Sequence, residues 1–242
     1  MRKINGVPIE ASTKLSALSG GEVLKWDAST GNMVWEDQDG GVYRSVWYGG
    51  RGVFGGSYAG GTSDVIDYIT IATTGNAIDF GDLSIQLKYQ AGVNDTTRAV
   101  FAGGANTSFT PVNTIEYVTV QTTGNATDFG DLSSARTNSG GTGDTTRGLI
   151  AGGWDAAFSN PINNIDYITI QTTGNSTDFG DLTAATAGPA GASNATRAVF
   201  AGGYVSARSN VIGYVTIATT SNSTDFGDLT ASRDDLAGCS GT

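Results

Sequence analysis

The sequence predicts an all-β protein built from a fourfold repeat that follows a short and different N-terminal segment. The repeat is seen in a Phe-Gly-Asp-Leu block whose phenylalanines, Phe80, Phe129, Phe179 and Phe226, are separated by 49, 50 and 47 residues. Each repeat also contains alternating runs of β-branched and aromatic residues, which are typical of strands. The chain has 36 glycines in 242 residues and only 15% charged residues, which favours tight turns and stacked sheets over large helices.

The first 42 residues are expected to form a separate attachment module. Residues 15–26 lead into a turn at residues 27–32 that contains Gly31 and Asn32, and residues 33–36 follow it. Two short strands that flank this turn predict a small β-hairpin. Such a hairpin is marginal on its own, so we expect Leu24, Trp26 and Trp35 to attach it to a partner. Three partners stay open: the repeat domain, another copy of the chain, or a larger particle. The expected domains are therefore residues 1–42 and 43–242, with a polar linker near residues 37–41.

Each repeat is predicted to supply four short strands. The first strand ends in Gly-Gly and is followed by a loop of variable length. The second strand carries a tyrosine, as in residues 115–120, and a Thr-Thr-Gly-Asn turn leads into the Phe-Gly-Asp-Leu strand. A segment of small residues then forms a fourth strand before the next repeat. Four strands per repeat make the blade of a β-propeller, so we expect four blades of about 50 residues each.

The order of the pieces predicts how the ring closes. Residues 231–242 have the composition of the small-residue strand, and the strand that should follow them is found at residues 51–56. We therefore expect the C-terminal segment to complete the first blade and close the ring, because closure removes exposed strand edges. Residues 42–50 echo the first strand of the repeat and are expected to pack beside it.

Composition argues against several classes of function. A net charge of -10 is unfavourable for binding nucleic acid or an anionic membrane surface. The chain has no histidine and a single cysteine, Cys239, so neither a Ser-His-Asp nor a Cys-His catalytic set nor an internal disulfide can form. We expect a protein that is not an enzyme and needs no cofactor. The N-terminus lacks the apolar core of a signal peptide, so folding in a cytoplasm is expected.

Two repeated sets of charged residues could either bind an ion or make structural contacts. The acids of the Phe-Gly-Asp-Leu strand could hold one calcium ion per blade, or they could cap turns and pair with arginines. We favour the structural role because no Asp-x-Asp-x-Asp-Gly spacing is present. The repeated arginines could likewise bind an anion, but one per blade favours pairing between blades. The acids are Asp79, Asp82, Asp128, Asp131, Asp178, Asp181, Asp225 and Asp228, and the arginines are Arg51, Arg98, Arg147 and Arg197.

The loops after each Gly-Gly differ between repeats and are the best candidates for a binding site. In a propeller they would share one face. They contain aromatic residues among Asn, Ser and Asp, a combination that suits recognition of a sugar or a protein. The alternative is that the rings pack onto the blade tops. The candidate ligand-binding residues are Tyr58, Phe109, Trp154, Phe158 and Tyr204.

The repeat resembles the kelch repeat in its Gly-Gly doublet, its tyrosine strand and its length. It departs from the kelch pattern six residues after the tyrosine, where Thr74, Thr123, Thr173 or Thr220 stands in place of the usual tryptophan. The Arg-x-Val-Phe-x-Gly-Gly and Asp-Phe-Gly-Asp-Leu blocks also resemble proteins of marine and cyanobacterial phages. Residues 18–36 resemble short modules of bacteriophage tail fibres and other virion appendages.

These resemblances imply a kelch-like β-propeller in a bacteriophage virion, as a tail fibre, tail tip or capsid-surface appendage. Its expected role is host-surface recognition through the variable loops, with a host glycan or protein as partner. The N-terminal module would bind other virion proteins, and homo-oligomers stay open. The alternative is a structural or decoration protein that binds only virion proteins. A third reading, an enzyme acting on surface polysaccharide, would need a pair of special carboxylates that the sequence does not show.

Overall fold

The structure is a computed structural model that describes residues 3–4, 7–8, 22–27, 32–37, 50–58 and 62–240. Every regular element within these residues is a β-strand. The described part of the chain therefore contains no helix long and apolar enough to cross a membrane. The chain divides into two compact units, Met1–Trp47 and Tyr48–Thr242, and each is described by itself. The strand predicted within residues 42–50 falls outside the described residues, except for Gly50.

The N-terminal unit contains two short antiparallel pairs of strands. β1 (Lys3–Ile4) pairs with β2 (Val7–Pro8), and β3 (Glu22–Asp27) pairs with β4 (Asn32–Asp37). In the second pair Leu24 lies opposite Trp35 and Trp26 lies opposite Met33. These are the two strands of the predicted hairpin. An attachment role for Leu24, Trp26 and Trp35 stays a prediction.

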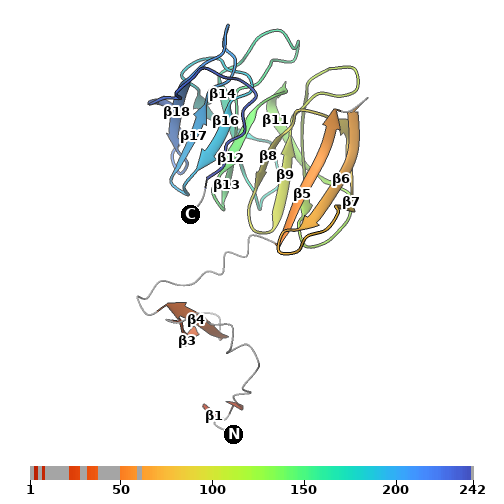
Figure 1. Cartoon of the computed structure of the whole chain (residues 1–242), viewed down its shortest axis with the longest axis vertical. Coiled ribbons are helices and arrows are strands. Elements are labelled where there is room, and N and C mark those ends of the chain that lie inside the picture. Colours follow the sequence, from red (N-terminus) through yellow and green to blue (C-terminus); the bar gives the residue numbers. More distant parts are fainter. Residues whose placement is uncertain are drawn as a thin grey trace. The chain divides into compact units, whose positions relative to one another are not determined.

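The larger unit consists of four antiparallel sheets that follow one another along the chain (Figure 1). Sheet I has three strands, and sheets II, III and IV have four each, in chain order. This all-β arrangement is compatible with a β-propeller. Sheet I comprises β5 (Arg51–Tyr58), β6 (Thr62–Thr70) and β7 (Ile78–Leu87); sheet II, β8 (Ala91–Asn94), β9 (Arg98–Ala102), β10 (Val112–Thr119) and β11 (Thr127–Arg136); sheet III, β12 (Gly140–Gly143), β13 (Arg147–Ala151), β14 (Asn164–Thr169) and β15 (Thr177–Asp181); sheet IV, β16 (Ala190–Ser193), β17 (Arg197–Ala201), β18 (Val211–Thr216) and β19 (Thr224–Asp228).

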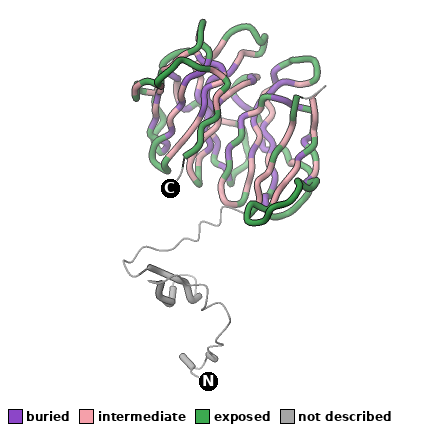
Figure 2. The backbone as a smooth tube through the Cα atoms, in the orientation of Figure 1, coloured by how far each residue is buried: buried purple, intermediate pink, exposed green. Residues whose placement is uncertain are grey.

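The hydrophobic core lies between successive sheets (Figure 2). Phe129, from the Phe-Gly-Asp-Leu strand of sheet II, packs in one cluster with Ile150 and Ile168 of sheet III. The same phenylalanine meets Tyr117 of its own sheet edge to face, with ring centroids 5.9 Å apart. Equivalent clusters join sheets I and II and sheets III and IV. Each repeat therefore buries its apolar face only against its neighbours, as in other repeat proteins.

The repeated arginines join adjacent sheets, as expected. Nη1 of Arg51 donates to the carbonyl of Val120 at 3.2 Å, and Nη1 of Arg98 donates to the carbonyl of Ile170 at 3.0 Å. Arg147 makes the same contact with Ile217 at 2.9 Å. Each guanidinium also lies over the tyrosine ring of its own sheet, at 4.2 to 4.8 Å from the centroid. The alternative expectation, pairing with the repeated aspartates, is wrong for the described residues, where the guanidiniums bind carbonyls instead.

The glycine of the Phe-Gly-Asp-Leu strand lets the next repeat approach closely. Gly130 has φ 142°, and a Cβ atom there would lie 2.4 Å from the carbonyl oxygen of Gly174 in the next Thr-Gly-Asn turn. In the same contact the backbone N–H of Asp131 donates to Oδ1 of Asn175 at 3.1 Å. The two most regular motifs of the sequence therefore form one recurring contact between sheets, which assigns them to the scaffold.

The first sheet is not completed by the C-terminal segment in this structure. Within the described residues β5 pairs only with β6. Residues 229–240 instead continue along sheet IV, where the backbone N–H of Leu229 donates to Asn210 and that of Arg233 donates to Ser209. Gly238 lies beside β16, because a Cβ atom there would be 2.7 Å from the carbonyl oxygen of Gly191. Closure of the ring therefore stays a prediction.

Candidate ligand-binding loops

The variable loops start from one constant backbone position. The residue after Gly-Gly is Ala105 in sheet II, Trp154 in sheet III and Tyr204 in sheet IV. Each of the three forms an isolated bridge with the segment that precedes the sheet: Ala105 with Lys88, Trp154 with Thr137, and Tyr204 with Ala187. The scaffold thus presents a different side chain at the same place in each repeat, and only sheets III and IV place an aromatic ring there.

Three of the predicted binding residues form one exposed cluster, which we call the aromatic platform. The ring of Trp154 lies 5.9 Å from that of Phe158 and 5.7 Å from that of Tyr204, measured between centroids. The ring planes are tilted by 38° and 34°. Phe158 is 39% exposed and Tyr204 is 36% exposed, while Trp154 is half-buried. The platform therefore leaves aromatic surface from two neighbouring repeats open to solvent.

Hydrogen bonds around Asp155 hold the loop that carries the platform. Oδ1 of Asp155 accepts from the backbone N–H of Ser159 at 2.9 Å, and Oδ2 accepts from Nδ2 of Asn160 at 3.2 Å. The hydrogen bond from the Ser159 backbone is the main reason why the pKa of Asp155 is lowered. Phe158 adopts φ 53°, a left-handed conformation that the closed loop imposes. The ring of Phe158 is therefore positioned by its loop as well as by Trp154.

An ion pair stands next to the platform in sheet IV. Nε of Arg208 lies 2.7 Å from Oδ1 of Asp234, and the two side chains are 68% and 26% exposed. The hydrogen bond from Arg208 lowers the pKa of Asp234 and raises that of Arg208. Arg208 also forms a backbone bridge with Tyr204. Since Nε is the atom that binds Asp234, the exposed end of the guanidinium can donate to a ligand on the platform.

The other two predicted residues belong to a second cluster, which encloses a lysine. Nζ of Lys88 lies 4.4 Å from the ring centroid of Tyr58, 2.9 Å from that of Phe109 and 5.9 Å from that of Tyr89. Lys88 is only 2% exposed, and burial lowers its pKa, whereas attraction to the ring faces favours its charged form. This cluster is the lysine cage. Its inner faces are occupied by the chain's own cation, which makes it a poorer ligand site than the platform.

Sequence reasoning missed Lys88 and Tyr89. They lie in the link between sheets I and II, away from the variable loops, and no repeat partner of either is a lysine or an aromatic residue. That departure from the repeat is the one signal that could have drawn attention to them.

A small apolar cavity accompanies a second departure from the repeat. Gly213 stands where sheets II and III carry Glu116 and Asp166, and the surrounding cavity has a volume of about 260 Å³. Phe200 and Val205 contribute to its lining. Val205 directly follows Tyr204, so the cavity borders the loop of the platform. A methyl or acetyl group of a ligand is the chemistry that such an apolar space accepts.

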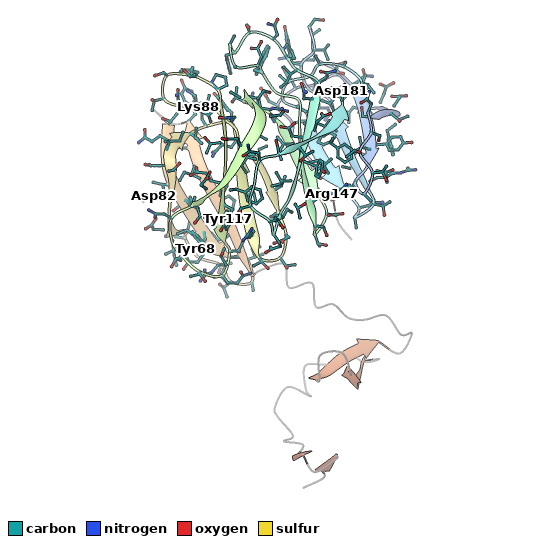
Figure 3. All side chains as sticks on the ribbon, turned by 180° about the vertical axis from the view of Figure 1, so that it is seen from behind. Tyr68, Asp82, Lys88, Tyr117, Arg147 and Asp181 are labelled. Atoms are coloured by element: carbon teal, nitrogen blue, oxygen red, sulfur yellow. The ribbon has the colours of Figure 1, made fainter. Side chains whose placement is uncertain are left out.

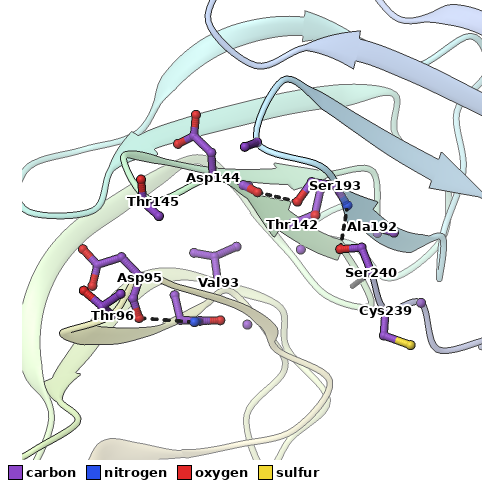
Figure 4. Close-up of a pocket in the computed structure, with 17 residues that line it drawn as sticks. Val93, Asp95, Thr96, Thr142, Asp144, Thr145, Ala192, Ser193, Cys239 and Ser240 are labelled. Atoms are coloured by element: carbon purple, nitrogen blue, oxygen red, sulfur yellow. Dashed lines mark hydrogen bonds between the residues drawn. The ribbon is translucent and has the colours of Figure 1, made fainter. Parts of the chain in front are cut away.

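Another cavity is formed by the innermost strands and the C-terminal segment, and its lining suits a structural role (Figure 4). It has a volume of about 540 Å³ and contains no aromatic side chain. The carboxylates at its edge serve their own turns: Oδ1 of Asp95 accepts from the backbone N–H of Arg98, and Oδ1 of Asp144 accepts from that of Arg147, both at 2.7 Å. Backbone and small side chains dominate the rest of the lining, so the cavity offers little that would orient a ligand.

Metal binding gains no support from the described part of the chain, which brings no three His, Cys, Asp or Glu side chains together. Asp79 and Asp82 and their counterparts in sheets II and IV are exposed. Comparison with known proteins adds no family. No protein-family model matches the chain, and no curated protein has a significantly similar sequence.

Proposed function

We propose that the protein is a non-enzymatic adhesin of a bacteriophage virion, in which each chain contributes four kelch-like propeller blades and binds a host-surface glycan through the aromatic platform. The observation that carries this proposal is the exposed cluster of Trp154, Phe158 and Tyr204 beside polar side chains. Apolar faces of sugar rings stack on aromatic side chains, while hydroxyl groups need donors and acceptors at the rim. The phage-like features of the sequence supply the biological setting.

The polar groups at the rim match this ligand class. Arg208 supplies N–H donors, and the Asp155 and Asn160 loop supplies carboxylate and amide oxygens. The net charge of the chain, -10, makes an acidic polysaccharide a poor partner except at Arg208. A neutral glycan is therefore the favoured class of ligand, and the protein binds it without converting it chemically.

A glycan array followed by titration calorimetry tests the proposal with the whole chain. Trp154→Ala should weaken binding at least about tenfold, because central aromatic residues dominate such interfaces. Trp154→Phe should keep part of the affinity. Phe109→Ala is the control, since it removes an aromatic ring from the lysine cage and leaves the platform intact. Unchanged glycan binding by Trp154→Ala would reject the platform as the site, provided that its circular dichroism spectrum matches that of the wild type.

The alternative role is assembly, as a decoration protein that binds only other virion proteins. The hairpin of β3 and β4 favours it, because Leu24, Trp26 and Trp35 lie in strands of a small separate unit. The two roles differ in which residues matter. If the protein serves only assembly, Trp26→Ala and Trp35→Ala abolish incorporation into particles while Trp154→Ala leaves infection unchanged. If it is an adhesin, Trp154→Ala particles assemble but adsorb poorly to host cells.

A further inference from the structure

Among the residues that the structure describes, nothing covers the two outer faces of the four-sheet array as each inner face is covered. Phe226 of sheet IV is 55% exposed, whereas its counterparts Phe80, Phe129 and Phe179 are each 2% exposed. At the other end Ile71, which directly follows β6, is 65% exposed, whereas the equivalent Ile170 is fully buried. The outer faces therefore carry the same apolar residues as the inner ones but leave them in water.

Each outer face also carries its half of the contacts that join adjacent sheets. Arg197 lies over Tyr214 as the other arginines lie over their tyrosines, yet within the described residues it has no carbonyl partner. Gly227 has φ 137° like its counterparts, but nothing lies within 4 Å of the position its Cβ would occupy. The complementary residues belong to sheet I, where Ile71, Gly75 and Asn76 are all exposed.

The two outer faces also carry opposite charges at matching positions. Between sheets II and III the fully buried Arg136 and Asp166 form an ion pair at 3.1 Å. The repeat places Arg233 on sheet IV at the position of Arg136, and Asp67 on sheet I at the position of Asp166. Arg233 even keeps the same local hydrogen bond, from Nε to the carbonyl two residues earlier, at 3.4 Å in both cases. The other two inner interfaces carry no such arginine, since Leu87 and Thr186 take its place.

The strand edges match in the same way. β8 pairs with β9 so that Val93 lies opposite Val100. The repeat equivalents of these residues are Cys239 in the C-terminal segment and Val53 in β5. Gly238 already occupies the place of an innermost strand beside β16. Within the described residues the C-terminal segment and β5 each keep one edge unpaired, and these two edges would pair in a defined register, with Cys239 opposite Val53.

We propose that these faces bind each other between two copies of the chain, head to tail, so that sheet IV of each copy packs on sheet I of its partner. The two faces belong to opposite ends of the array: Figure 1 shows β5, β6 and β7 of sheet I at one side and β17 and β18 of sheet IV at the other. In the view from behind, Figure 3 likewise shows Tyr68 and Asp82 of sheet I on the opposite side from Asp181 of sheet III. Heterologous contacts of this kind close into rings when the rotation allows. Two copies give a ring of eight sheets, the upper end of the usual range of four to eight, which a third copy would exceed.

Charge reversal at the shared ion pair tests the proposal by light scattering with size-exclusion chromatography. The wild-type chain should have twice the 24.7 kDa mass of one chain. Arg233→Asp alone, or Asp67→Arg alone, should raise the dissociation constant at least about a hundredfold, because each variant opposes like charges in a buried contact. Mixing the two variants should restore the dimer, since one contact regains the ion pair in reverse and the other keeps it unchanged.

Covalent trapping provides a second test that does not depend on affinity. Cys239 is the only cysteine of the chain, so Val53→Cys creates a single new candidate partner for it. Under mild oxidation the variant should run as a reducible dimer on a denaturing gel, because directly opposed strand residues lie within reach of a disulfide. Ser57→Cys in the same strand is the control and should link poorly, since its register places it away from Cys239.

Closure within one chain would give the opposite results. A monomeric wild-type chain would overturn the proposal, and so would a Val53→Cys disulfide that forms within a monomer. The same conclusion would follow if the Arg233→Asp and Asp67→Arg changes compensated each other only when combined in one chain and not on mixing.

Discussion

Removing the carboxylate of Asp166 should be among the most damaging single changes in the repeat domain. Asp166 is fully buried in β14 and accepts four hydrogen bonds, from the backbone N–H and Oγ of Ser133, from Oγ of Ser176 and from Nη2 of Arg136, at distances of 2.8 to 3.1 Å. Asp166→Ala leaves the guanidinium of Arg136 buried without its counter-charge.

The expected loss follows from that buried cation. Breaking a buried ion pair by removing one partner costs about 3–5 kcal/mol. Burial also lowers the pKa of Arg136, while Asp166 opposes that effect, so the variant is left with the desolvation penalty alone. For a domain of this size each kcal/mol shifts the melting temperature by roughly 2–4 °C, which predicts a fall of roughly 6–20 °C.

Urea unfolding followed by circular dichroism measures this loss, and a double-mutant cycle separates the pair from its surroundings. Arg136→Leu reproduces the residue that sheet I carries at this position, Leu87. In the Asp166→Ala background Arg136→Leu should recover stability, because it removes the stranded charge. If Asp166→Ala costs less than about 1 kcal/mol, or if adding Arg136→Leu lowers the stability further, the ion pair does not make the predicted contribution to the stability of the domain.

Three further predictions concern the scaffold and the loops. Gly130→Ala should lower the unfolding free energy by more than about 2 kcal/mol, because the new Cβ would meet the backbone of the next sheet. Gly227→Ala, in the uncovered strand β19, should lose about half as much in the monomeric state. Lys88→Met should lower the melting temperature more than Lys88→Arg, since only arginine keeps a cation inside the aromatic cage. The pKa of Asp155 is lowered in the folded loop, so the stabilisation that its carboxylate gives to the loop is fully present above the unfolded pKa of about 3.9 and is lost as the pH falls through the folded pKa. Amide exchange in the loop should therefore rise at low pH in the wild type, and not in Asp155→Asn.

The architecture was predictable because the repeat supplies the same physical signals four times. The alternation in residues 115–120 and the glycine after Phe129 appear in each copy. One copy alone could have been assigned the wrong secondary structure, but four matching copies support the same strands. The strands of the hairpin at residues 22–27 and 32–37 were predictable from the same alternation. The bridging role of the arginines followed from their recurrence, and three of them have it.

The grouping of the loop residues could not be read from the sequence. The five aromatic residues proposed for ligand binding separate into two clusters, and the lysine that divides them lies outside the loops. The partner of the repeated arginines was also hidden, because a backbone carbonyl leaves no mark in a sequence. Closure of the first sheet depends on how far each sheet rotates from the last, and no residue pattern encodes that angle directly.

Because a backbone bridge anchors the residue after Gly-Gly, the loop that follows contributes to the protein surface and little to the stability of the strands. Ala105, Trp154 and Tyr204 share one backbone geometry, and the prolines Pro111 and Pro161 complete the bridge in sheets II and III. We expect that loops anchored in this way can be exchanged among repeats, lengthened or shortened without disturbing the strands below. Under the proposed role as an adhesin, a few substitutions in these loops would change the ligand while the fold is preserved, and a new binding surface could be engineered one loop at a time.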